Sequence, residues 1–139
     1  MMMSNLVIFI SMFLVQYVFM SFIMTDKIEN ITNSAGKVYV STIMGLIMVI
    51  MMNHTFDLQQ FSIFGGLLIA VLFLYKMQFG INDKNYLNEM IEHHSMALLT
   101  SEAILKKTNN SYVADIAQRI RNTQEKEIFE MRNLIRIVG

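Results

Sequence analysis

The chain is 139 residues long, carries eleven acidic and eleven basic residues, and contains neither cysteine nor proline. This composition excludes disulfides, thiolate metal sites and cysteine nucleophiles, and the absence of a basic block argues against nucleic acid as a partner. Only five of the 22 charged residues precede Lys76. An apolar first part followed by a charged second part predicts a membrane region and then a water-facing region.

Residues 6–24 form the first predicted membrane span. They contain no charge, and 19 helical residues extend about 28 Å, enough to cross a bilayer core. A cleaved signal peptide is the alternative. Because no basic stretch precedes the segment and no small-residue cleavage site follows it, we expect a retained span.

Residues 38–52 and 61–75 are two further apolar segments, each shorter than the roughly 20 residues of a usual span. Lys37 and Lys76 lie at their ends, where long side chains can reach the lipid headgroups, and the third helix could continue to Phe79. Small residues recur every four positions in both, which lets membrane helices approach closely. These are Ser41 and Gly45 in one segment, and Ser62, Gly66 and Ala70 in the other. We therefore predict three spans in a lipid bilayer.

Lysine distribution suggests an orientation. With three spans, loop 25–37 and the C-terminal part lie on one side, which carries Lys27, Lys37, Lys76 and Lys84. The other side has no lysine or arginine near a span; His54, in its loop, is expected to be interfacial. Positive charge favours the cytoplasm, so we expect the C-terminal part there.

The residue pattern of the C-terminal part predicts two helices. Gly80 can end the third span, and Asn82 or Asp83 can cap a helix over 84–107. The run Thr108–Asn109–Asn110 then breaks the pattern, and Ser111 can cap the second helix. Its expected apolar positions are Val113, Ile116, Ile120, Ile128, Met131, Leu134 and Ile135, and the expected surface pairs are Glu102 with Lys106 and Asp115 with Arg119.

The predicted fold is an all-α membrane protein. Residues 1–80 form a region of three transmembrane helices, and residues 81–139 form a two-helix antiparallel hairpin. A hairpin with one buried seam is marginally stable by itself. We therefore expect it to pair with a second copy in a homo-oligomer, a dimer or higher, or to stack on the spans.

Polar residues interrupt the apolar stripes of both hairpin helices at one layer. If the chain turns about residue 109, His94 lies opposite Gln124 and Met90 lies opposite Ile128. The residues expected to converge are Met90, His93, His94, Gln124, Glu127 and Met131.

This cluster supports two interpretations. Imidazole with thioether suits copper, particularly Cu(I), whereas imidazole with carboxylate also suits Zn(II), Fe(II) or Cu(II). Adjacent histidines point about 100° apart on a helix, so both can bind one ion only at the edge of the seam. Alternatively, His, Gln and Glu can form a closed hydrogen-bond network without metal. No nucleophile paired with a base and no phosphate-binding loop is recognisable, so we do not expect an enzyme.

The sequence MIEHHSMALLTS, followed by Ile120, Gln124, Glu127, Ile128 and Met131, resembles the family named domain of unknown function 305. Its signature is a Met-Ile-x-His-His run and a later Gln-x-x-Glu-Ile-x-x-Met run. The upstream GKVYVSTIMGLIMVIMM is similar to the membrane-anchored branch of that family.

The resemblance implies a helical fold related to ferritin-like bundles, of which the hairpin would be half of a four-helix bundle. Some soluble members are implicated in copper binding through His and Met, which would carry over to Met90, His93, His94 and Met131. Several of those act outside the cytoplasm, in contrast to the lysine rule above. Two positions depart from the pattern: Glu92 replaces a usual proline and Thr100 a frequent methionine, for which Met96 could substitute.

The leading functional hypothesis is a membrane-anchored metal-binding protein that handles or senses copper. The alternative is a structural membrane protein whose hairpin mediates oligomer or partner contacts, with the His-Gln-Glu cluster as a polar lock.

Overall fold

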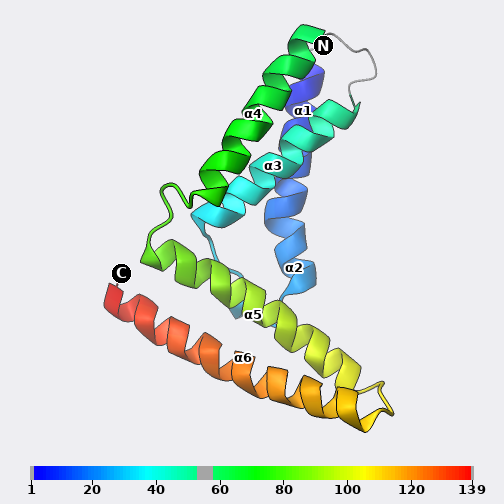
Figure 1. The fold of residues 1–139 in the computed structure, drawn as a ribbon, viewed down its shortest axis with the longest axis vertical. Coiled ribbons are helices and arrows are strands. Elements are labelled where there is room, and N and C mark those ends of the chain that lie inside the picture. Colours follow the sequence, from blue (N-terminus) through cyan, green and yellow to red (C-terminus); the bar gives the residue numbers. More distant parts are fainter. Residues whose placement is uncertain (1, 53–57, 139) are drawn as a thin grey trace. The chain divides into compact units, whose positions relative to one another are not determined.

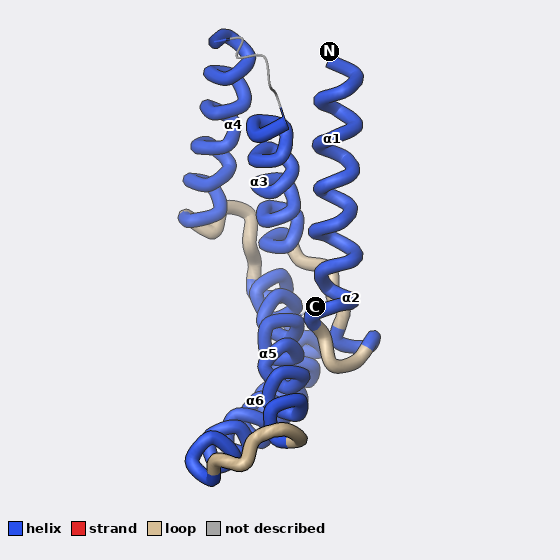
Figure 2. The backbone as a smooth tube through the Cα atoms, turned by 90° about the vertical axis from the view of Figure 1, so that its right-hand side faces the viewer, coloured by secondary structure: helices blue, strands red, loops and turns tan. Residues whose placement is uncertain are grey.

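The computed structural model describes residues 2–52 and 58–138, so His54 lies outside the described residues. Every regular element within these ranges is helical (Figures 1 and 2). The chain divides into two compact units. The first comprises Met1–Met20 and Ala35–Ile81, and the second comprises Ser21–Ser34 and Asn82–Gly139.

The N-terminal helical segment is continuous from α1 (Met2–Leu14) through a π-helical turn (Val15–Phe19) to α2 (Met20–Met24). The π-helical turn carries Tyr17, whose ring stacks on that of Phe13 with a centroid distance of 5.6 Å. Lys37 Nζ, from the start of α3 (Ala35–Met52), lies 4.8 Å from the centroid of the Tyr17 ring. This cation–π contact links the first helical segment to α3.

Three helical segments are long and apolar enough to cross a membrane: Ser4–Met24, Ala35–Met52 (α3) and Leu58–Lys76 (α4). They match the three predicted segments. The third does not reach Phe79 as a helix, because the chain turns after Lys76 and both Gln78 and Gly80 have positive φ angles. A positive φ is incompatible with continuing a right-handed helix.

The small residues of α3 lie against α1. Ser41 is fully buried, and a Cβ added to Gly45 would lie 2.7 Å from Cδ2 of Phe9 and 3.2 Å from its carbonyl oxygen. Close helix approach through this row is therefore confirmed. The corresponding row of α4, comprising Ser62, Gly66 and Ala70, is exposed in the chain.

The hairpin consists of α5 (Asp83–Leu105) and α6 (Ser111–Val138), which run antiparallel (Figure 1). Asn82 caps α5, as predicted, by accepting a hydrogen bond from the Asn85 N–H. The cap of α6 differs from the prediction. Ser111 is the first helical residue, and Asn110 Oδ1 accepts from the N–H of Tyr112 at 2.9 Å, because the preceding residue is the one whose side chain can reach the free amides of the first turn.

A small apolar core joins the two hairpin helices. Leu87, Ile91, Leu98, Ile128 and Met131 are buried together, with Met90 and Ile135 packed against them. The predicted apolar side of α6 is only partly used: Ile128 and Met131 are buried, whereas Val113, Ile116, Ile120 and Leu134 remain exposed.

The segment Ser21–Ser34, called the strap, consists of the last residues of α2 and the connection to α3, and it belongs to the same compact unit as the hairpin. Its polar groups hydrogen-bond to α5: Thr32 Oγ1 donates to the Asn88 carbonyl, and Asp26 N–H donates to Ser95 Oγ at 2.9 Å. The sequence pattern assigned residues 21–24 to the first span and residues 25–34 to a loop on the same side as the C-terminal part, both within region 1–80. The hairpin thus has a third packed element, which the apolar periodicity of the chain did not reveal.

Candidate functional site

His94 lies in the seam between α5 and α6. Its side chain is 23% exposed, and its Nδ1 atom lies 3.1 Å from Glu127 Oε2 of the facing helix. The two atoms are close enough for an ion pair, but their geometry is not that of a hydrogen bond. Nδ1 is buried and has no hydrogen-bond partner among the described residues. The structure therefore holds an imidazole nitrogen and a carboxylate oxygen side by side.

Two methionines flank this pair. Met90 precedes His94 by one helical turn and packs against the apolar core, while Met131 follows Glu127 by one turn and is buried in that core. Residues four apart lie on the same face of a helix. Each helix thus contributes a methionine and a polar donor to the seam, Met90 with His94 and Glu127 with Met131.

The other two predicted site residues lie differently. His93 is exposed, as expected from the angle of about 100° between neighbouring helical side chains. Gln124 is half-buried, but the residue that meets His94 is Glu127. The expected pairing of His94 with Gln124 assumed a tight turn about one residue, whereas residues 106–110 form a longer connection that permits a different register.

Within residues 2–52 and 58–138, no group of three or more His, Asp or Glu side chains could hold a metal ion. A metal at His94 and Glu127 would therefore need a donor of another kind. The thioethers of Met90 and Met131, each one helical turn from His94 or Glu127 on its own helix, are donors of that kind and are chemically suited to soft metal ions.

Polar contacts of α5 outside the seam were not predicted. Glu92, which departs from the pattern of the resembled family, accepts hydrogen bonds from Ser21 Oγ at 2.9 Å and from the Thr32 N–H at 2.7 Å. One face of α5 carries the polar residues Asn88, Glu92 and Ser95. This polar stripe in the sequence indicated that the face contacts another polar segment of the chain.

A second unpredicted contact lies between the helices towards the tip of the hairpin. Glu102 forms an ion pair with Arg121 of α6, with Nε and Oε1 3.3 Å apart. The sequence suggested Lys106 as its partner on the same helix. The expected pair of Asp115 with Arg119 is confirmed at 3.0 Å.

The C-terminal part of the chain has recognisable relatives. Residues 71–138 match the family model described as Domain of unknown function (DUF305). The DUF305 match includes the whole of α5 and α6 and all six predicted site residues, so the resemblance is confirmed for this part of the chain.

One curated relative, "Uncharacterized protein L153" from Acanthamoeba polyphaga mimivirus, is 36% identical over 69 residues. The match covers 50% of this chain and 45% of that protein, so the chain spans less than half the length of this relative. No solved structure matches the chain.

Proposed function

We propose that this chain is a membrane-anchored copper-binding protein, with a site in the hairpin seam made of Met90, His94, Glu127 and Met131. The observation that supports it is the buried Nδ1 of His94, which lies 3.1 Å from Glu127 Oε2 and has no hydrogen-bond partner among the described residues. A lone pair on Nδ1 that faces a carboxylate oxygen at this distance is stabilised by a positive charge between them, which either a proton or a bound metal ion can supply. Donors about 2.0–2.2 Å from one ion are separated by roughly 3 Å.

The donor set favours copper within this proposal. Thioether sulfur and imidazole nitrogen are soft ligands that select Cu(I), whereas Zn(II) and other divalent ions depend more on additional nitrogen and oxygen donors. Two methionines, a histidine and a carboxylate provide no nucleophile with an adjacent base. The proposed role is therefore copper handling or sensing rather than catalysis, with the three apolar helices as the anchor in a bilayer.

The test is a titration of the purified full chain in detergent with Cu(I), using a colorimetric chelator as competitor. We expect one bound ion per chain, and at least about tenfold weaker binding for His94→Ala, because loss of even an outer-shell partner weakens metal sites on that scale. His93→Ala is the matched control, since this neighbouring side chain is exposed, and its affinity should stay close to that of the unaltered chain.

Met131→Leu separates the two classes of metal. Leucine has a similar volume, so the core should tolerate it, but it lacks the sulfur. Cu(I) binding should weaken while Zn(II) binding does not. Equal Cu(I) affinity for the unaltered chain and for His94→Ala would refute the copper site.

The alternative role as a structural protein predicts a different outcome. If His94 and Glu127 act only as a polar lock, a double-mutant cycle of His94→Ala and Glu127→Gln should show coupling in the free energy of unfolding without any metal. Self-association of the hairpin into a larger helical bundle is expected both for a copper-binding protein and for a structural protein. The unused apolar residues Val113, Ile116 and Ile120 of α6 are compatible with it.

A further inference from the structure

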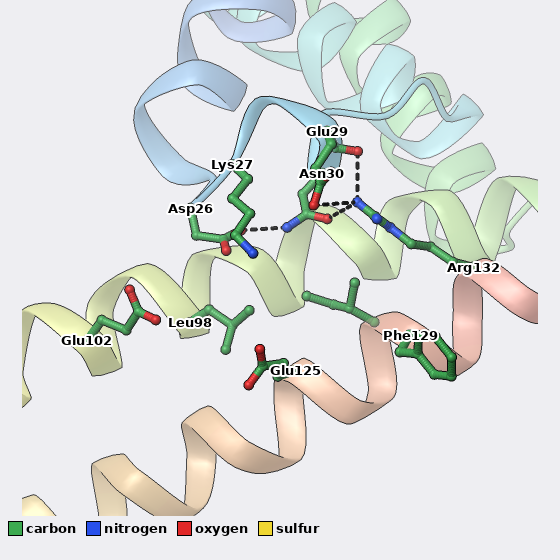
Figure 3. Close-up of a pocket in the computed structure, with 10 residues that line it drawn as sticks. Asp26, Lys27, Glu29, Asn30, Leu98, Glu102, Glu125, Phe129 and Arg132 are labelled. Atoms are coloured by element: carbon green, nitrogen blue, oxygen red, sulfur yellow. Dashed lines mark hydrogen bonds and ion pairs between the residues drawn. The ribbon is translucent and has the colours of Figure 1, made fainter.

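The strap connects the two hairpin helices through a chain of side-chain hydrogen bonds. On the α5 side, Ser95 Oγ donates to Asp26 Oδ1. Asn30 Nδ2 donates to the same Asp26 oxygen. On the other side, Asn30 Oδ1 accepts a hydrogen bond of 2.6 Å from a guanidinium nitrogen of Arg132, which belongs to α6 (Figure 3). A continuous polar bridge therefore runs from one helix to the other through Ser95, Asp26, Asn30 and Arg132.

The bridge is partly buried along its length. Ser95 is fully buried and Asn30 is only 3% exposed, whereas Asp26 and Arg132 are half-buried. Buried hydrogen-bond networks with every member satisfied specify one arrangement of the elements they join, because each broken bond leaves a desolvated polar group. Arg132 adds a second contact by donating to the Glu29 carbonyl at 3.1 Å. Asn30 is the residue that joins the two halves of the bridge.

The bridge attaches next to the proposed donors. Ser95 directly follows His94 on α5, and Arg132 directly follows Met131 on α6. Glu92, between Met90 and His94, accepts hydrogen bonds from Ser21 Oγ and the Thr32 N–H and so fastens both ends of the strap to α5. The turns of α5 and α6 that carry the donors are thus the turns that the strap holds.

We propose that the strap is a positioning element that holds α5 and α6 in the register at which His94 meets Glu127, with Asn30 as its central residue. A two-helix hairpin has a single seam, and here its core contains only a few buried side chains; such a seam specifies register weakly. The bridge supplies a second, direction-dependent link between the helices. The consequence for helix register is independent of any metal, whereas the consequence for copper rests on the proposed function.

The test uses Asn30→Asp in the full chain. This substitution keeps the shape of the side chain, removes the amide donor and places a second carboxylate beside Asp26. It therefore breaks the link between residue 30 and Asp26, while an oxygen that can accept from Arg132 remains. Asn122→Asp is the matched control, because Asn122 is exposed and its Oδ1 accepts from Gln118 Nε2, which an aspartate oxygen can also do. Spin labels at cysteines introduced at the exposed positions Tyr86 and Glu130 report the separation of α5 and α6.

For Asn30→Asp we expect a broader, longer distance distribution between the labels and faster amide hydrogen exchange in residues 26–32, neither of which Asn122→Asp should show. If the correctly registered fraction falls to a tenth, Cu(I) affinity should fall about tenfold. Arg132→Lys, which keeps the charge but loses the planar donor geometry, should change the label distances in the same direction to a smaller extent.

The outcomes separate the two proposals. Label distances that stay unchanged in Asn30→Asp and Arg132→Lys, while exchange in residues 26–32 accelerates, would overturn the positioning role of the strap. If instead the label distances change as expected but the unaltered chain binds no Cu(I), the proposed copper function fails and the positioning role stands.

Discussion

Single residues in this chain have different environments from close neighbours of the same type. His93 and His94 are adjacent, yet only His94 lies in the hairpin seam beside Glu127. Gly45 and Gly66 each belong to a row of small residues, yet only Gly45 lies against another helix. These contrasts provide matched pairs of variants, in which the chemical change is the same and the surroundings differ.

Gly45→Ala should destabilise the packing of α1 on α3. The added Cβ would lie 2.7 Å from Cδ2 of Phe9 and 3.2 Å from its carbonyl oxygen, so both the ring and the backbone must move. Overpacking of this kind costs about 1–3 kcal/mol, and thermal unfolding of the full chain in detergent should show a lower midpoint. Gly66→Ala is the control, because its added Cβ meets no atom of the described residues within 4 Å. Equal effects of the two substitutions would contradict the observed α1–α3 contact.

At the scale of elements, each of the two hairpin helices begins at an asparagine cap. For α5 this agrees with the sequence pattern, whereas for α6 the sequence pattern indicated Ser111 and the cap is Asn110. Asn110 Oδ1 accepts from the N–H of Tyr112 at 2.9 Å and of Val113 at 3.3 Å. Several consecutive residues that can cap a helix, here Asn109, Asn110 and Ser111, make the first residue of the helix hard to predict.

Asn110→Ala should reduce the stability of α6 by about 1 kcal/mol, since two amides of the first turn lose their acceptor. Ser111→Ala should change stability by less than about 0.5 kcal/mol, because serine at this position is already helical and exposed. Hydrogen exchange of the amides of residues 112 and 113, together with thermal unfolding, measures both effects. A larger loss for Ser111→Ala would assign the cap to the serine after all.

At the scale of the whole molecule, three apolar helical segments precede a charged hairpin. If all three cross a membrane, two spans separate the strap from the hairpin, so both lie on the same side. The hydrogen bonds between the strap and α5 agree with this arrangement, because both belong to one compact unit. Placement of that side in the cytoplasm, and self-association of the chain, stay predictions.

The absence of native cysteine allows a direct test of this topology. Single cysteines introduced by Lys27→Cys in the strap and Lys126→Cys in α6 should react with a membrane-impermeant maleimide from the same side of sealed vesicles. Ser4→Cys, at the start of the first span, should react from the opposite side. Labelling of Lys27→Cys and Lys126→Cys from opposite sides would mean that the number of spans between them is not two.

Much of the fold could be predicted from the sequence because it depends on local patterns. Apolar runs identify the three helical segments that are long and apolar enough to cross a membrane, and the spacing of four residues in α3 identifies Ser41 and Gly45 as a contact row. The position of His94 and Glu127 on apolar stripes indicates that both face the hairpin seam. Helix length and helix face follow from periodicity along the chain, so they require no knowledge of distant residues.

Only the tertiary structure decided which residues meet. The register of the hairpin pairs His94 with Glu127 rather than Gln124, because register depends on the connection and on packing across the seam. The strap is the clearest case: Asn30 contacts Arg132 more than 100 residues further along the chain. Its polar residues show no periodicity, and hydrogen bonds between segments so far apart in sequence arise only when the chain has folded.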